Sequence, residues 1–164
     1  MNSADDIESR LGAITNYLRL SPDLATAGQP TRKQFEDLSA AGFRTVINLA
    51  LTTSTNALPD EREIVERHGM EYVHIPVVWE APRFEDFATF AEVMREWRAA
   101  PVFVHCALNM RVSAFVFLHR TLIDATAPAA AEKDLHRIWT PDEVWPAFIA
   151  EVRRRWTEER ISKV

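Results

Sequence analysis

The stretch PVFVHCALNMRVS, from Pro101 to Ser113, decides how this chain folds. Its first five residues are mostly apolar and predict a short buried strand, and a helix is expected from Ser113 to about Ile123. Cys106, the only cysteine of the chain, lies directly after the strand and shortly before the helix. A helix N-terminus offers unpaired backbone N–H groups and a partial positive charge, which together bind anions. The sequence therefore predicts an anion-binding loop around Cys106.

The surroundings of Cys106 favour a reactive thiolate over an inert thiol. A free cysteine has a pKa of about 8.5, and the field of a helix N-terminus lowers the pKa of a thiol placed there. Arg111 adds a permanent charge whose planar guanidinium fits two phosphate oxygens. Ser113 is a candidate hydrogen-bond donor to the thiolate. An isolated cysteine is more often buried and inert, but the strand–Cys–Arg–helix context favours a nucleophile.

The composition is that of a globular protein. The chain has 164 residues, of which 47% are apolar, and its 19 basic and 24 acidic residues give a net charge of −5. A length below about 200 residues predicts a single domain. We expect it to span residues 1–164, with a core at about 18–122 and a helical C-terminal part at about 126–164, as the secondary-structure signals place them.

The same counts exclude several classes of site and partner. One cysteine excludes an internal disulfide and a four-cysteine zinc site, and the five histidines lack metal-ligand spacing, so no metal or cofactor is expected. A mildly acidic chain is atypical of nucleic-acid binders, and no apolar run approaches the ~20 residues that cross a bilayer. The acidic N-terminus lacks the basic region of a secretory signal. A cytoplasmic protein is expected, and its oligomeric state stays open.

Strands and helices alternate along the chain. Strands are expected at residues 24–27, 43–49, 71–77 and 101–105. Helices are expected at 7–18, 31–42, 60–69, from 82 onward, 113–123, 129–138 and from 141 onward. This order predicts an α/β fold of three layers, with a largely parallel central sheet of four to five strands and helices on both faces. The carboxyl ends of the strands then share one rim, where a ligand is expected.

Four segments resemble the cysteine-dependent phosphatase superfamily of tyrosine and dual-specificity-like enzymes, and within it the bacterial beta-lactamase-hydrolase-like phosphatase group. In chain order they are Ala27–Pro30, Gly42–Leu49, Tyr72–Val77 and Val102–Cys106. The resemblance implies a phosphatase that hydrolyses a phosphomonoester, such as phosphotyrosine or another phosphoprotein group, through a phosphocysteine intermediate. Cys106 would attack phosphorus, Arg111 would hold the phosphoryl oxygens, and a phosphorylated protein or small molecule would be the partner.

The loop departs from the usual pattern of that superfamily, which places five residues between Cys and Arg. Here four intervene. Either the loop is one residue shorter, as in rhodanese-like sulfurtransferases, or Ser113 keeps its usual place and Arg111 stands one position early. The candidate phosphate-binding residues are Ala107, Leu108, Asn109, Met110, Arg111 and Ser113. Asn109 stands where the family commonly has glycine, and asparagine is the next most tolerant residue at positive φ.

The resemblance places the general acid on the loop Val77–Arg83, where Glu80 is the only carboxylate. Partial burial there would raise the pKa of this carboxyl, as acid catalysis requires. Asp86 is a second candidate, with Asp60 and Glu61 behind it.

Two further residues are expected at the same rim. Gln29 closes the first predicted parallel strand, and His105 is expected to be a structural hydrogen-bonding residue next to the nucleophile.

Two other functions remain open at this point. The short Cys–Arg spacing and the unassigned acid favour a phosphate-binding regulatory pseudophosphatase without turnover. A rhodanese-like sulfurtransferase, with a persulfide on Cys106, is the other alternative.

Overall fold

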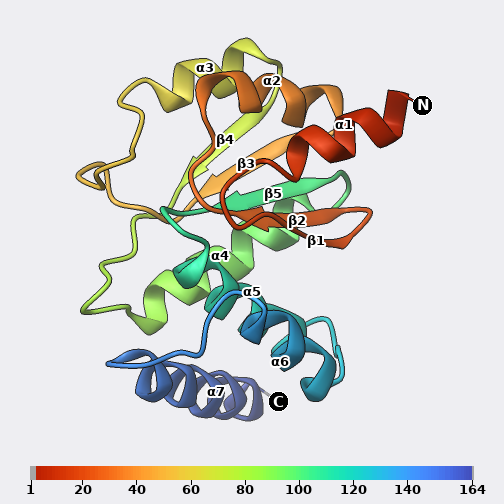
Figure 1. Ribbon diagram of the computed structural model, residues 1–164. Helices are drawn as coiled ribbons and strands as arrows, with labels where there is room; N and C mark the ends of the chain where they lie inside the picture. Colours follow the sequence, from red (N-terminus) through yellow and green to blue (C-terminus); the bar gives the residue numbers. More distant parts are fainter. Residues whose placement is uncertain (1–2, 164) are drawn as a thin grey trace.

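A computed structural model describes residues 3–163 and places five strands in one central sheet (Figure 1). The strand order is β1-β2-β5-β3-β4. The strands are β1 (Leu18–Ser21), β2 (Leu24–Ala27), β3 (Thr45–Asn48), β4 (Glu71–His74) and β5 (Val102–His105). Strands β2, β5, β3 and β4 run parallel, whereas β1 pairs antiparallel with β2. The predicted α/β class and largely parallel sheet are confirmed.

Helices cover both faces of the sheet (Figure 1). One face packs against α1 (Ser3–Leu11), α2 (Arg32–Ala40) and α3 (Glu61–Arg67). The other packs against α4 (Phe84–Trp97), α5 (Met110–Leu122), α6 (Pro128–His136) and α7 (Trp145–Ser162). Successive side chains of a strand point to opposite faces. Accordingly, Phe103 joins the α1–α3 cluster, while Val102 and Val104 join the α4–α7 cluster.

Local sequence signals explain both boundaries of α2, which starts near the rim and ends at the opposite edge of the sheet. Thr31 caps α2 in a capping box, because its side chain accepts from the amide of Gln34 and the Gln34 side chain accepts from the amide of Thr31. After α2 the chain reverses at Gly42, whose φ of +98° is accessible mainly to glycine. The residues that follow enter β3.

The predicted helix over residues 7–18 is wrong in its second half. The helix ends at Leu11, and Leu18 begins the antiparallel strand β1. Leu11, Ile14 and Leu18 are all buried, so the apolar spacing is satisfied by a helix, a turn and a strand in succession. Asn16 has a φ of +51°, which reverses the chain between the helix and the strand. Residues 18–21 form a strand because they pair with β2. The spacing of apolar residues along the chain does not reveal such a pairing.

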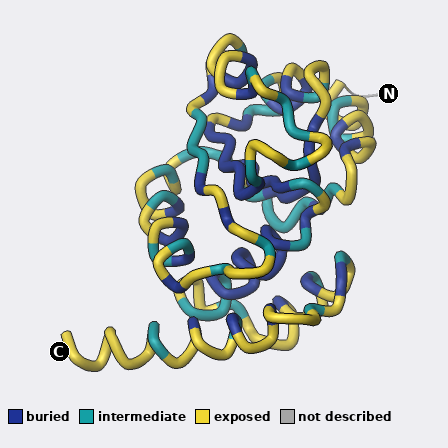
Figure 2. Tube along the Cα trace, turned by 90° about the vertical axis from the view of Figure 1, so that its left-hand side faces the viewer, coloured by how far each residue is buried: buried dark blue, intermediate teal, exposed yellow. Residues whose placement is uncertain are grey.

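Two other helix starts differ from the prediction. Helix α5 begins at Met110, three residues before the expected Ser113, and α7 begins at Trp145 rather than Pro141. The segment before α7 forms a turn in which Glu143 has a φ of +56°. Figure 2 shows the buried strands and inner helix faces, and the exposed final turns of α7. Among the helices of residues 3–163, none is long and apolar enough to cross a bilayer.

Candidate active site

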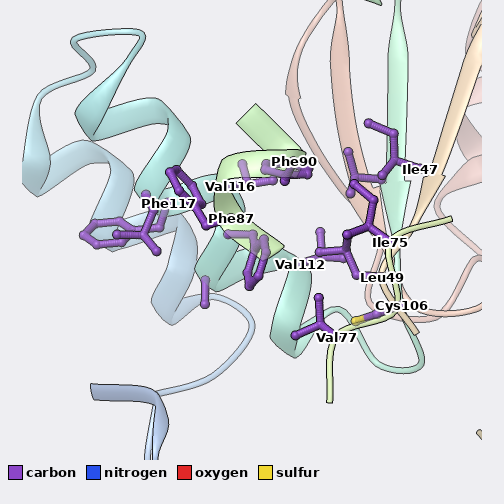
Figure 3. Close-up of a cluster of buried hydrophobic side chains, with 14 of the residues drawn as sticks. Ile47, Leu49, Ile75, Val77, Phe87, Phe90, Cys106, Val112, Val116 and Phe117 are labelled. Atoms are coloured by element: carbon purple, nitrogen blue, oxygen red, sulfur yellow. The ribbon is translucent and has the colours of Figure 1, made fainter. Parts of the chain in front are cut away.

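Cys106 lies where β5 ends, at the edge of the apolar cluster of α4 and α5. Its side chain is 1% exposed and is a free thiol. Figure 3 shows its sulfur close to Val77 and Leu49, which follow β4 and β3. The carboxyl ends of three neighbouring parallel strands therefore meet at Cys106, as the rule for ligand sites in such sheets requires.

The turn after Cys106 shows which residue of the loop takes the left-handed conformation. Asn109 caps α5 with φ +71° and ψ +3°, and the helix begins at the next residue. The left-handed residue thus stands three positions after Cys106, where the superfamily has its glycine. The structure agrees with the interpretation in which the turn keeps its place, Arg111 comes one position early, and Val112, fully buried, occupies the usual arginine position.

The carbonyl groups of the loop are held from outside it. The oxygen of Cys106 accepts from His105 Nδ1 (3.2 Å), that of Ala107 from the amide of Gln29 (3.1 Å), and that of Leu108 from Asn16 Nδ2 (2.9 Å). Asn56 Nδ2 also donates to the oxygen of Ala107 (3.2 Å). A trans peptide points its C=O and the following N–H in opposite directions. The amides of residues 107, 108 and 109 therefore point away from these partners.

Most of these amides and the next three are free to bind a ligand. Within the described chain, no protein acceptor pairs with the amides of residues 107, 108 and 110–112, whereas the antiparallel bridge between Gly28 and Leu108 directs the amide of Asn109 towards β2. Buried N–H groups are almost always paired in native proteins. A run of unpaired amides that ends in a helix N-terminus forms a concave site for an oxyanion.

Arg111 shares one cavity with Cys106. The cavity measures about 250 Å³ and is lined by Trp79, Cys106, Ala107, Leu108, Met110 and Arg111. The Arg111 side chain is largely buried, and its Nη1 donates to the carbonyl of Val77 at 3.0 Å. This bond fixes the guanidinium at the cavity and leaves its remaining donors for an anion. The other cavity walls are apolar, so an incoming phosphate ester would place its organic group against them.

Ser113 is not bonded to Cys106. Its hydroxyl donates to the carbonyl of Met110 (2.9 Å) and accepts from Trp139 Nε1 (2.9 Å). The hydroxyl therefore ties α5 to the segment before α7. The donor that the sequence suggested for the thiolate is engaged elsewhere.

Gln29 and His105 belong to a buried ion-pair network behind the loop. Glu61 accepts from Gln29 Nε2 (2.6 Å) and pairs with His105 Nε2 (2.7 Å). The other ring nitrogen of His105, Nδ1, faces the carbonyl oxygen of Cys106, so the ring joins Glu61 to the start of the loop. Burial alone raises the pKa of Glu61, but the charge of His105 and the hydrogen bonds from His105 and Gln29 outweigh it, so the pKa lies below its ordinary 4.5.

The candidate acids lie outside the cavity lining. Glu80 is exposed on the loop between β4 and α4, next to Trp79. Asp86 accepts from the amide of Arg83 and so caps α4. Asp60 pairs with Arg32, and Glu61 is committed to His105. Among the described residues, no group of three or more His, Cys, Asp or Glu side chains is arranged to hold a metal ion.

The sequence places Trp79 at the rim, on the loop of Glu80, but does not predict its contacts with the C-terminal part. Trp79 lines the cavity, its Nε1 donates to Glu143 (3.0 Å), and its ring lies 5.4 Å from those of both Trp139 and Trp145. The position of Trp79 on the acid loop was a usable signal. Its partners, about 60 residues later, leave no signal in local spacing.

Comparisons with known proteins agree with this geometry. The family model described as a DSP-PTPase phosphatase fused to NAD+ kinase matches residues 15–144. The beta-lactamase hydrolase-like protein of Agrobacterium fabrum is 32% identical over 108 residues, which are 64% of this chain and 25% of that protein. The chain thus spans about a quarter of the length of that curated relative.

Solved structures give the same picture. A DUF442 protein of Shewanella putrefaciens CN-32, described as a phosphatase, superposes with a TM-score of 0.81 at 33% identity, covering 90% of this chain and 97% of that one. TpbA of P. aeruginosa shares the fold, with a TM-score of 0.67 at 18% identity over 84% of each chain. These matches confirm the resemblance found in the sequence. The chain belongs to the DSP-type phosphatase family whose model describes a phosphatase domain fused to NAD+ kinase.

Proposed function

We propose that this protein hydrolyses a phosphomonoester through a phosphocysteine intermediate on Cys106. One observation carries the proposal: Cys106 and Arg111 line a single cavity at a loop whose amides, at residues 107, 108 and 110–112, have no partner in the described chain. Membership of a DSP-type phosphatase family supports the same chemistry. The site residues then have the roles of nucleophile for Cys106 and phosphoryl-oxygen ligand for Arg111 and the amides of residues 107, 108 and 110–112.

The reaction proceeds in two displacements. The Cys106 thiolate attacks phosphorus, an S–P bond forms, and the bond from phosphorus to the leaving oxygen breaks. Arg111 and the loop amides stabilise the charge on the three equatorial oxygens. The leaving oxygen takes a proton from a general acid. Water then attacks phosphorus, the S–P bond breaks, and inorganic phosphate leaves with the thiolate restored.

Glu80 is the candidate acid, because it is the only carboxylate on the loop that also carries Trp79 into the cavity wall. It is exposed, so the loop must close over bound substrate before the proton moves. Loop closure of this kind is common in enzymes that assemble their site on the substrate.

The cavity favours an aryl phosphate. Trp79, Leu108 and Met110 give apolar walls at its mouth, and Leu108 is 49% exposed. An aromatic leaving group gains both apolar burial and ring stacking there, whereas an alkyl phosphate lacks the stacking and a sugar phosphate lacks both. Phosphotyrosine is the protein-bound group that combines an aromatic ring with a phosphomonoester. TpbA, which shares the fold, has been solved with pTyr bound.

Hydrolysis of p-nitrophenyl phosphate tests the proposal. Wild-type protein should release p-nitrophenol, Cys106→Ser should release none above the uncatalysed rate, and Glu80→Gln should lose the alkaline limb of the pH–rate profile. Wild-type protein no faster than Cys106→Ser would refute turnover.

A second candidate function is phosphate binding without turnover. It is favoured by one observation, the absence of a carboxylate from the residues that line the cavity in the described chain. It predicts that inorganic phosphate raises the melting temperature of wild-type protein while the assay above shows no turnover. Measurable turnover lost in Cys106→Ser excludes this alternative.

A further inference from the structure

The loop around Cys106 contains no glycine, although its turn has a backbone conformation that favours glycine. Asn109 adopts φ +71° and is fully buried. Asparagine tolerates this region better than most residues, yet at a cost that glycine avoids. Something outside the loop must therefore hold Asn109 in place.

The side chain of Asn109 is fastened at two points. Its Nδ2 donates to Thr26 Oγ1 (3.0 Å) and to the carbonyl oxygen of Asn16 (2.8 Å). Thr26 belongs to β2 and is 1% exposed, so the first bond is buried and shielded from water. Asn16 returns a bond to the loop, because its own Nδ2 donates to the carbonyl of Leu108 (2.9 Å).

We propose that Thr26 and Asn16 are positioning residues for the anion-binding loop, acting through Asn109. Asn16 and Asn109 both have positive φ and each donates to the backbone at or beside the other. The two left-handed turns are thus locked together, one after α1 and one before α5. A glycine adopts this positive φ at little cost because it has no Cβ. At Asn109, hydrogen bonds from the side chain offset the cost of the same conformation.

The hydrogen bonds among Asn16, Thr26, Leu108 and Asn109 orient the amides that would bind the ligand. The bond to Leu108 O turns the amide of Asn109 the opposite way, and the left-handed turn at Asn109 brings the chain directly into the first amides of α5. Releasing Asn109 would let these peptides rotate and would weaken the convergence of their N–H groups on an anion. The inference rests on the proposed function only in that the loop binds a phosphoryl group.

Thr26 offers the sharpest test. Thr26→Val keeps a β-branched side chain in the strand but removes the acceptor, whereas Thr26→Ser keeps the acceptor. The readout is the alkylation rate of Cys106 by iodoacetamide as a function of pH, with and without inorganic phosphate. Cys106 is the only cysteine, so alkylation reports on this site alone. Neither measurement needs turnover, so the result stands apart from the outcome of the phosphatase assay.

Loss of one buried hydrogen bond should weaken protection of Cys106 by phosphate about fivefold in Thr26→Val and move the half-maximal alkylation pH upward. Thr26→Ser should stay within about twofold of wild type, since the acceptor is retained. One result would overturn the proposal: Thr26→Val lowers the melting temperature but leaves the alkylation profile and the phosphate protection unchanged. Thr26 would then stabilise the fold without positioning the loop.

A substitution at Asn16 gives a second, independent test, and a substitution at Asn56 is its control. Asn16→Gly tolerates the same positive φ and removes the bond to Leu108 O. Asn56→Gly removes a similar bond to Ala107 O, but that oxygen keeps the amide of Gln29 as a donor. Weaker phosphate protection in Asn16→Gly than in Asn56→Gly supports the proposal, and equal protection in the two variants contradicts the role of Asn16.

Discussion

Arg111 is the second residue of α5, one position before the place that the superfamily gives its arginine. One step along a helix turns a side chain by about 100° and shifts it by about 1.5 Å. The carbonyl of Val77 compensates for that rotation by binding Nη1 and fixing the guanidinium at the cavity. If Arg111 binds the phosphoryl group as proposed, it does so from an anchor on the segment after β4, and we expect the fork geometry to matter as much as the charge.

Arg111→Lys keeps the charge and loses the planar fork. We expect kcat/KM for p-nitrophenyl phosphate to fall about 10²–10³-fold, the usual effect of losing one preorganised oxyanion donor. Arg95→Lys, at an exposed position on α4, is the control and should change little. Steady-state kinetics of both variants give the comparison. Equal activity of Arg111→Lys and wild type would show that the charge alone suffices.

The sequence was informative about the loop itself and silent about what holds it. The positive φ of Asn109 could be predicted because glycine is absent from the loop and asparagine is the next most tolerant residue. Its anchors at Thr26 and Asn16 lie 83 and 93 residues away along the chain. Contacts of that separation exist only once β2 and β5 pair, so no local pattern encodes them.

At the scale of elements, the pair of Glu61 and His105 joins α3 to the end of β5. Both side chains are almost fully buried. Removing one partner of a buried pair leaves an uncompensated charge, which is costly. The pair therefore fixes the first turn of α3 against the strand that delivers Cys106.

The lowered pKa of Glu61 makes this contribution depend on pH. Because the folded pKa lies below the unfolded value near 4.5, the unfolded chain binds the proton first as the pH falls. The stabilisation is complete at neutral pH and is lost progressively as the pH drops below about 4.5. Glu61→Gln should lower the free energy of unfolding by about 2 kcal/mol at pH 7 and by less in acid.

Urea unfolding of wild type and Glu61→Gln from pH 7 to pH 3.5 measures this difference. Glu96→Gln, an exposed change on α4, is the control and should stay within about 0.5 kcal/mol of wild type at every pH. A gap between wild type and Glu61→Gln that does not narrow in acid would contradict the assignment.

Element order could be predicted from the sequence, whereas one edge of the sheet could not. The central parallel strands β3 and β5 have apolar, β-branched residues that are typical of strands buried on both faces. Strand β1 has the pattern LRLS, with burial at only its first position, and Leu18 at that position also fits the helical spacing of the preceding segment. Only the antiparallel pairing with β2 decides that these residues form a strand and not a continuation of the helix.

At the scale of the whole molecule, the C-terminal helices are part of the same core as the sheet. Ala131, Leu135, Trp145 and Phe148 belong to one buried cluster with residues of β3, β5 and α4. The cluster reaches the cavity through Trp79, which packs on Trp145 and bonds to Glu143. We infer that residues 3–163 unfold as one unit and that the C-terminal part sets one wall of the site.

Glu143 offers a way to separate stability from function. Its φ of +56° is strained for a residue with a side chain, and such strain is typical of functional positions. Glu143→Gly relieves the strain but removes the hydrogen bond to Trp79 Nε1. Stability should stay level or rise by up to about 1 kcal/mol, while KM for p-nitrophenyl phosphate should rise about twofold to fivefold as Trp79 loses its partner.

Ala125 is a matched control, because it has the same φ of +56° in the turn between α5 and α6. Ala125→Gly should match the stability change of Glu143→Gly and leave KM unchanged, since it does not line the cavity. Urea unfolding and steady-state kinetics on both variants give the two readouts. If KM rises equally in both, a general loosening of the C-terminal part is responsible. If it rises only in Glu143→Gly, the hydrogen bond from Trp79 to Glu143 holds the wall that Trp79 forms, in addition to the packing of Trp79 on Trp139 and Trp145.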